Sequence, residues 1–196
     1  VVGVMLLAST YLFYNKGVAV KMLPFDNKNE FQVVVDMPEG TTLEETRNAS
    51  RAIAQYIKGQ ENIKDYQIYT GTSSPITFNG LVRHYDVRHA ANMADIQVNL
   101  TDKGTRKDQS HDIVKRLRDG IISAGDHYGA NVKIVEIPPG PPVLSTLVAE
   151  IYGPTSEKAE ALASQVIVAF KATEGIADVD WSLEADQQEL KILIDR

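Results

Sequence analysis

The chain has 196 residues, of which 43% are apolar and 23% are charged, and these ordinary globular values exclude a disordered chain. Its length suffices for one large domain or two small ones, each with its own core. The 20 basic and 26 acidic residues give a formal net charge of -6, which argues against nucleic acid as a partner. The absence of cysteine excludes zinc knuckles, thiol catalysis and disulfide frameworks.

The first 14 residues carry no charge, and the first of them is Val1 rather than Met. A membrane helix needs about 20 apolar residues, and a secretory signal begins with basic residues, so the segment matches neither pattern in full. We interpret residues 1–20 as the end of a transmembrane helix whose beginning precedes the chain. Lys16 and Lys21 then lie just outside the bilayer. The alternative is a buried core helix of a soluble protein.

Strand and helix patterns alternate between residues 30 and 137. Thr41 and Thr42 stand three residues before Glu44 and Glu45, which is a capping-box signature for a helix start. Apolar residues then recur at helical spacing. The first strand is a β-branched run that ends at Pro38, and segments 63–70 and 94–100 alternate between apolar and polar residues. The predicted elements are strand 30–37, helix 43–58, strands 63–70 and 94–100, helix 107–124 and strand 132–137. This order, β-α-β-β-α-β, is that of a ferredoxin-like unit.

A proline cluster, PPGPP at residues 138–142, follows and predicts a stiff linker that cannot join a sheet interior. After it the pattern starts again, with a strand at 147–152, a helix capped by Thr155 and Ser156, and a hairpin of strands 179–183 and 190–194. The fold class is therefore α+β, with two ferredoxin-like units, of which the second lacks its closing α-β. The predicted organisation is the helix end 1–20, a first unit 21–137, the linker 138–142 and an incomplete second unit 143–196.

Residues 71–92 form a long polar segment without a sustained period. Loops longer than about 12–15 residues inside compact domains are usually functional or mobile. His84 and His89 in this segment could be metal ligands or a general base, but a zinc site needs three or four converging ligands. Because Arg83 and Arg88 lie beside them, we interpret the segment as a solvated basic loop.

Other motifs give no indication of catalysis. Glu44 and Glu45 complement the helix dipole at a first turn, and the glycines form neither a GxGxxG nor a GxxxxGK pattern. Trp181 lies at core spacing on a predicted strand, which favours a packing role. The sequence therefore predicts no enzyme, no metal site and no cofactor.

Five segments carry a family resemblance: KMLPFDNKNEFQVVVDMPEGTTLEET, GTSSPITFNGLVRHYDV, ADIQVNL, PPGPPVLSTLVAEIYGP and the terminal LKILIDR. With them the chain resembles the second periplasmic half of a resistance-nodulation-cell division (RND) efflux permease of the hydrophobe/amphiphile efflux type. In that family a transmembrane helix leads into porter subdomains. The resemblance covers essentially the whole chain, and it identifies the two ferredoxin-like units as porter subdomains.

The resemblance implies a proton-driven antiporter of the bacterial inner membrane, with residues 21–196 in the periplasm. It implies a homotrimer that works with a periplasmic adaptor protein and an outer-membrane channel, and that confers multidrug resistance. Small molecules would be exported through a cleft between the two subdomains. The family's proton-relay residues belong to membrane helices outside this chain.

The resemblance also implies positions along the substrate path. The loop after the second strand matches the family's switch loop, which separates two substrate pockets, and its path residues are Thr72, Ser73, Ser74, Pro75, Ile76, Thr77 and Phe78. The cleft positions are Gln32, Val34, Gln67, Gln97, Lys133 and Val135. Multidrug members line their pockets with Phe or Met, so the mostly polar residues of this chain imply a more polar path.

Copper and silver exporters of the family carry three Met ligands, which correspond here to Val33, Met93 and Val143. One thioether cannot make the soft site that Cu(I) prefers, so the metal-exporting branch is disfavoured. Two alternatives to a transporter remain open. One is a free-standing ferredoxin-like module that binds small molecules, and the other is a soluble enzyme that uses the loop containing His84 and His89.

Overall fold

The structure is a computed structural model that describes residues 2–15, 17, 27–75, 78–82, 84–137, 145 and 147–183. The predicted helix at the start of the chain is present as α1 (Val2–Tyr14), and its described side chains are exposed. None of the helices among these residues has both the length and the apolar content to cross a membrane. That residues 1–20 end a membrane helix stays a prediction.

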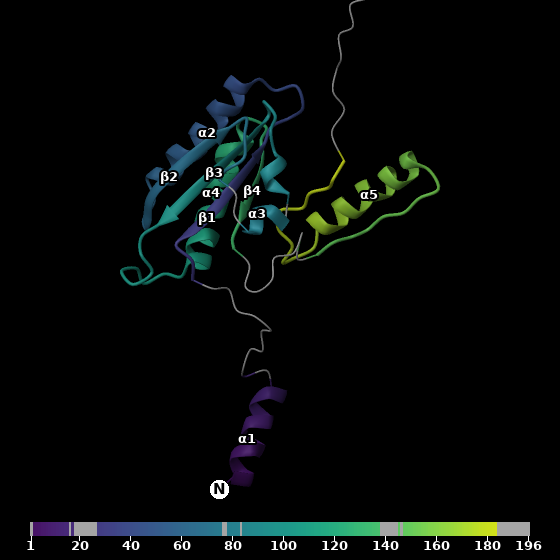
Figure 1. Ribbon diagram of the computed structural model, residues 1–196. Helices are drawn as coiled ribbons and strands as arrows, with labels where there is room; N and C mark the ends of the chain where they lie inside the picture. Colours follow the sequence, from purple (N-terminus) through teal and green to yellow (C-terminus); the bar gives the residue numbers. More distant parts are fainter. Residues whose placement is uncertain are drawn as a thin grey trace, which may run out of the picture.

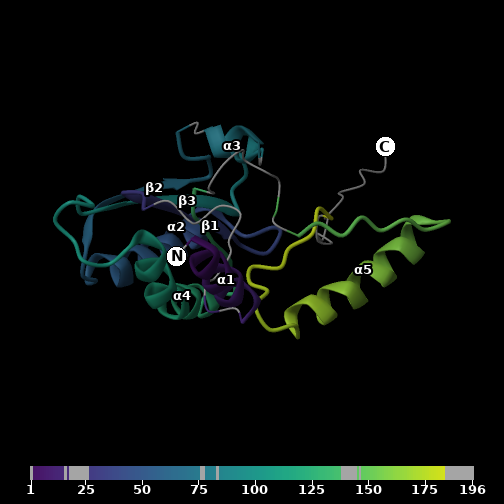
Figure 2. The same cartoon turned by 90° about the horizontal axis from the view of Figure 1, so that it is seen from below.

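Four antiparallel strands form one sheet in the order β2-β3-β1-β4. Helices α2 and α4 cover one face of this sheet, as Figures 1 and 2 show. The elements are β1 (Glu30–Asp36), α2 (Leu43–Lys58), β2 (Ile63–Thr70), β3 (Met93–Leu100), α4 (Ser110–Asp126) and β4 (Asn131–Val135). This arrangement confirms the predicted β-α-β-β-α-β unit and the α+β fold class.

The core lies between the sheet and the two helices. Successive strand residues point to opposite faces, so Phe31, Val33 and Val35 of β1 all pack toward α2 and α4 and are at most 1% exposed. Helix α2 contributes Ile53 and Ile57, which are fully buried. Each such side chain contributes about 1.5–3 kcal/mol on burial, so this apolar layer dominates the stability of the unit.

The capping-box prediction is confirmed at the start of α2. The Thr42 hydroxyl accepts a hydrogen bond from the Glu45 N–H at 3.3 Å, and the Glu45 carboxylate accepts one from the Thr42 N–H at 3.2 Å. This reciprocal pair satisfies two donors that a helix start leaves without partners. The helix therefore begins where the sequence pattern places it.

The long segment between β2 and β3 contains two short helices that the sequence pattern did not indicate. They are α3 (Phe78–Val82) and a 3₁₀ turn, η1 (Tyr85–Val87). Figure 2 shows α3 on the side of the sheet opposite to α2 and α4. The segment therefore returns across the face of the sheet that the long helices leave open.

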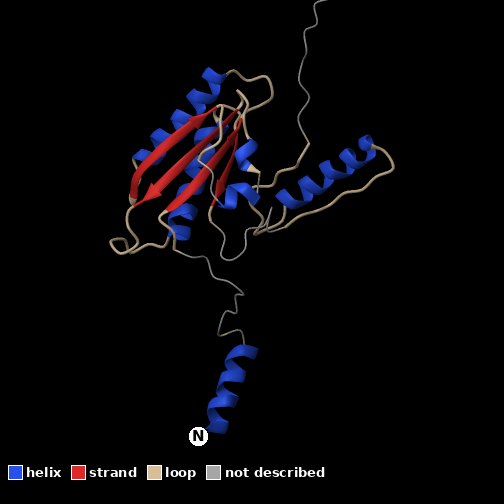
Figure 3. Cartoon of the chain, in the orientation of Figure 1, coloured by secondary structure: helices blue, strands red, loops and turns tan. Residues whose placement is uncertain are grey.

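The second unit differs from its prediction. Helix α5 (Ser156–Lys171) is present with Thr155 as its N-cap, but residues 147–152 and 179–183 form no strand (Figure 3). The physical reason is that a strand needs a hydrogen-bonded neighbour, and neither segment has one among the described residues. Trp181, predicted to pack in a core, is 39% exposed. The linker 138–142 and the predicted strand 190–194 lie outside the described residues.

The packing predicts that Ile53→Ala will destabilise the unit strongly. Its side chain is fully buried between helix and sheet, and removing a buried Ile typically costs about 2–5 kcal/mol. Urea unfolding followed by circular dichroism measures the change in the free energy of unfolding. Leu147→Ala is the control, because Leu147 is 59% exposed and should change that free energy by less than about 0.5 kcal/mol. Equal losses in both variants would contradict this core assignment.

Candidate functional site

The face of the sheet opposite to α2 and α4 is polar, and we call it the polar face. The residues of this face follow from the alternation of side chains along each strand, because every second residue points away from the core. Its central residues are Gln67, Tyr69, Asp95, Gln97, Gln32, Val34, Asp36, Lys133 and Val135. A sheet with one sealed face and one polar face is the ordinary antiparallel solution, and it leaves this surface free for contacts with other groups.

The six predicted cleft residues all lie on the polar face, in two adjacent cross-strand rows. Pairing aligns Gln67, Gln97, Gln32 and Val135 in one row, and Val34 and Lys133 in the next. Their exposure differs: Gln67 is exposed, Gln97 and Lys133 are half-buried, and Gln32, Val34 and Val135 are buried. The structure thus brings the six positions together, but mainly Gln67 and Gln97 offer surface to a ligand, because the Lys133 side chain is 13% exposed.

The predicted switch loop is described in part. Residues 71–75 cross the polar face, where the Ser74 N–H donates to Asp95 Oδ2 at 2.8 Å and Gln32 Nε2 donates to the Ser74 hydroxyl at 3.1 Å. Thr72 Oγ1 lies 3.1 Å from His89 Nδ1. Ile76 and Thr77 lie outside the described residues, and Phe78 begins α3.

A chain of charged side chains runs beneath this loop. Arg88 Nη2 lies 2.6 Å from Asp36 Oδ1, and Arg88 Nε lies 3.5 Å from Asp95 Oδ1. Gln32 Nε2 also donates to Asp95 Oδ2, at 2.9 Å. The Arg88 side chain is 13% exposed, so its interpretation as part of a solvated basic loop is wrong for this residue. It is buried because η1 folds back onto the polar face and places Arg88 over two carboxylates.

The same network reaches the segment that follows α5. Lys133 Nζ lies 2.8 Å from Asp36 Oδ2 and also pairs with Asp180. Asp178 accepts from Arg118 of α4 at 2.6 Å and from the Ile134 N–H of β4 at 3.3 Å. Acidic side chains therefore fasten this segment to the β4 edge of the sheet.

Burial and neighbouring charges shift the pKa values of this network. Burial acts to raise the pKa of Asp36, but attraction to Arg88 and Lys133 outweighs it and holds the pKa below its usual value. Burial raises the pKa of Asp95, although the hydrogen bond from Ser74 and the charge of Arg88 act against the rise. Burial acts to lower the pKa of Lys133, but Asp36 and Asp180 raise it overall.

Sequence reasoning missed Asp36, Asp95 and Arg88 as a group. The available signal was an acidic residue at an outward position of each of two strands that are otherwise deeply buried. His84 and His89 do not join this network; His84 is exposed and adopts a left-handed backbone, with φ of 56°. Within the described ranges, no group of three or more potential ligands is placed to hold a metal ion.

Two of the three positions that match the Met ligands of metal exporters, Val33 and Met93, lie on opposite faces of the sheet. Val33 is fully buried in the core on the helical side of the sheet, whereas Met93 is half-buried at the start of β3. Val143 lies outside the described residues.

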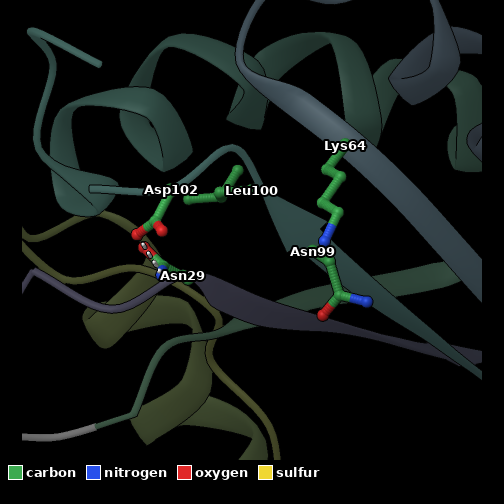
Figure 4. A pocket seen from close by; sticks show the side chains of 5 residues that line it. All are labelled: Asn29, Lys64, Asn99, Leu100 and Asp102. Atoms are coloured by element: carbon green, nitrogen blue, oxygen red, sulfur yellow. Dashed lines mark hydrogen bonds between the residues drawn. The ribbon is translucent and has the colours of Figure 1, made fainter. Parts of the chain in front are cut away.

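A pocket of about 340 Å³ lies at the far end of β3 from Asp95 (Figure 4). Its lining is mostly polar and consists of Asn29, Lys64, Asn99, Leu100 and Asp102. Asn29 donates to Asp102 across it at 3.2 Å. None of the predicted path residues lines this pocket.

Comparison with known proteins agrees with the ferredoxin-like fold. Two crystal structures of a heavy metal efflux pump, in crystal forms I and II, match with TM-scores of 0.64 and 0.62 at 13% sequence identity. Each match covers 94% of this chain but only 19% and 18% of the pump's chain, so the chain spans less than a fifth of that protein's length. At this identity the likeness concerns the fold alone. A comparison with curated proteins finds no match.

The family follows from the sequence itself. The pattern of the AcrB/AcrD/AcrF family matches residues 1–196, which is the full length of the chain. The chain therefore belongs to this family of RND efflux transporters, as its resemblance implied.

Charge pairing at Asp36 predicts a pH-dependent loss in Asp36→Asn. The variant leaves Arg88 and Lys133 with a neutral partner, so it should lower the free energy of unfolding at pH 7 by about 1–3 kcal/mol. Because the folded-state pKa of Asp36 lies below its unfolded value, this stabilisation is present above about pH 4 and is lost as the pH falls through the folded pKa.

Urea unfolding at several pH values measures this difference. The gap between the wild type and Asp36→Asn should shrink below about pH 4. Asp108→Asn is the matched control, because Asp108 pairs with Arg116 at 2.7 Å but is 41% exposed. It should change the free energy by less than about 1 kcal/mol. A gap that does not vary with pH would contradict the assigned pairing.

Proposed function

We propose that this chain is the periplasmic porter region of a proton-driven efflux transporter that exports polar small molecules across the bacterial inner membrane. Membership in a family of RND efflux transporters supports the transporter class. The observation that carries the substrate preference is the pair of accessible amides, Gln67 and Gln97, side by side on the polar face. Amide side chains hydrogen-bond to polar solutes and offer little apolar area to flat lipophilic drugs.

The substrate route runs over the polar face and beneath the loop at residues 71–75. This placement is supported by the crossing of residues 71–75 over the strands that carry the glutamines, with Ser74 held against Asp95 and Gln32. Gln67 and Gln97 keep accessible surface there. The route therefore lies on the side of the sheet that α2 and α4 do not cover.

The wider assembly belongs to the same proposal. The complete protein works as a homotrimer in the inner membrane, with an adaptor and an outer-membrane channel, and residues 21–196 lie in the periplasm. It acts by transport and not by enzymatic catalysis. The free-standing binding module has no observation of its own in its favour, because the family pattern extends over the whole chain. The enzyme alternative depended on the loop that contains His84 and His89. His84 is exposed, and the contact of His89 Nδ1 with Thr72 Oγ1 at 3.1 Å is exposed to solvent, so this loop offers weak support for an enzyme.

Cells that carry or lack the complete gene provide the test. We expect the gene to raise resistance to small polar drugs and organic anions, and to change resistance to large lipophilic dyes less, because the accessible positions are amides. Minimum inhibitory concentrations in an efflux-deficient strain measure both effects. Resistance confined to copper and silver salts would contradict the proposed substrate class.

A substitution on the polar face should move the substrate preference. Gln97→Phe replaces a half-buried amide by an aromatic ring, and we expect about a threefold or larger shift in relative resistance from polar toward lipophilic compounds. Gln55→Phe is the matched control, because Gln55 is exposed on α2, on the opposite side of the sheet. The same shift in both variants would contradict a route over the polar face.

A further inference from the structure

The loop at residues 71–75 is held through a single buried carboxylate. Asp95 Oδ2 accepts hydrogen bonds from the Ser74 N–H and from Gln32 Nε2, at 2.8 and 2.9 Å. Gln32 also donates to the Ser74 hydroxyl, so three groups meet at one point. Ser74 is 8% exposed and Asp95 is 1% exposed, although both lie on the polar face. The contact thus fixes the backbone of the loop, not merely one of its side chains.

Burying the Asp95 carboxylate costs free energy of folding, so its presence at this position calls for a structural reason. Removing a carboxylate from water costs several kcal/mol, and well-packed apolar residues commonly stabilise such a site as well or better. An apolar residue is accommodated at the neighbouring position, since Val34 faces Asp95 across the β1–β3 pair and is fully buried. What an apolar residue cannot supply is an acceptor for the Ser74 N–H. The acid therefore gives the loop a defined position.

The Arg88 guanidinium lies beside the other oxygen of the Asp95 carboxylate. Its Nε lies 3.5 Å from Asp95 Oδ1, and neither atom makes a hydrogen bond within the described part of the chain. The guanidinium lies closer to Asp36, at 2.6 Å, and donates to the Val35 carbonyl at 3.3 Å. One largely buried cation is thus shared by two acids, and its position directly after η1 decides how firmly Asp95 is held.

We propose that Arg88 and Asp95 are positioning residues that hold residues 71–75 over the polar face and thereby set which substrates pass beneath the loop. The inference rests on the proposed function, because these residues begin the predicted switch loop. Its physical content is independent of transport: without the guanidinium, the Asp95 carboxylate loses its fixed orientation, and Ser74 loses its anchor. The loop then opens more often while the core, which lies on the other side of the sheet, stays closed.

A buried thiol reports this opening directly. The 196 residues contain no cysteine, so Ser74→Cys introduces a unique thiol at a position that is 8% exposed. We expect Arg88→Gln to speed the labelling of this thiol by a maleimide about tenfold, and Arg88→Lys to do so less. Arg116→Gln is the matched control, because Arg116 pairs with Asp108 on the surface, away from the loop. Equal labelling rates with Arg88→Gln and Arg116→Gln overturn the proposal.

A second thiol separates loop opening from general unfolding. Ser50→Cys lies fully buried on α2, in the core side of the same unit. Labelling that accelerates at Ser74→Cys but not at Ser50→Cys supports the proposal. Equal acceleration at both thiols overturns it, because Arg88 would then support the fold as a whole and not the loop.

Transport in cells that carry the complete gene tests whether Arg88 and Asp95 affect substrate specificity. We expect Arg88→Gln to change the ratio of KM values for a small and a bulky transported compound by about threefold or more, and Arg88→Lys to restore part of the difference. A uniform fall in transport rate with unchanged KM ratios overturns the specificity role. If the wild-type gene exports nothing, the proposed function fails, but the thiol measurements still decide whether Arg88 and Asp95 position the loop.

Discussion

The organisation of the polar face depends on one shared cation, the guanidinium of Arg88 between the carboxylates of Asp36 and Asp95. Both acids stand at outward positions of strands whose other side chains form the core, so neither can be moved without a shift of register. Asp95 is buried and the Asp36 side chain is 22% exposed, and two carboxylates this close on adjacent strands repel each other unless a cation lies between them. The chain supplies it by returning from β2 across the open face, and that return also brings the loop at residues 71–75 over the sheet.

The regular elements of the first unit could be predicted because local physics determines them. Helix α2 has a reciprocal cap at Thr42 and Glu45, β3 alternates between apolar and polar residues, and β1 is a β-branched run. The long-range contacts could not be predicted in this way. Arg88 belongs to a polar loop, and its burial depends on where η1 docks, which no periodic pattern encodes. Residues 147–152 and 179–183 carried strand patterns, but a strand forms only where a neighbour completes its hydrogen bonds.

The fold bears on the family of this chain, whereas the side chains of the polar face bear on its substrate. Likeness to a heavy metal efflux pump at 13% identity concerns the backbone arrangement and says nothing of the cargo of this chain. The accessible side chains of the polar face do bear on the choice of substrate. They are amides, together with one lysine that is already paired to Asp36. The proposed preference for polar small molecules rests on the residues of the polar face and is separate from the question of family.

The most direct measurement is substrate protection of a thiol on the polar face of the complete transporter, with its other cysteines replaced. Gln67→Cys places the thiol on the exposed end of the glutamine row, and Gln55→Cys places it on the outer side of α2. A transported compound should slow the labelling of Gln67→Cys during active export and leave that of Gln55→Cys unchanged. Unchanged labelling at Gln67→Cys, or equal slowing at both positions, would contradict a substrate route over this face.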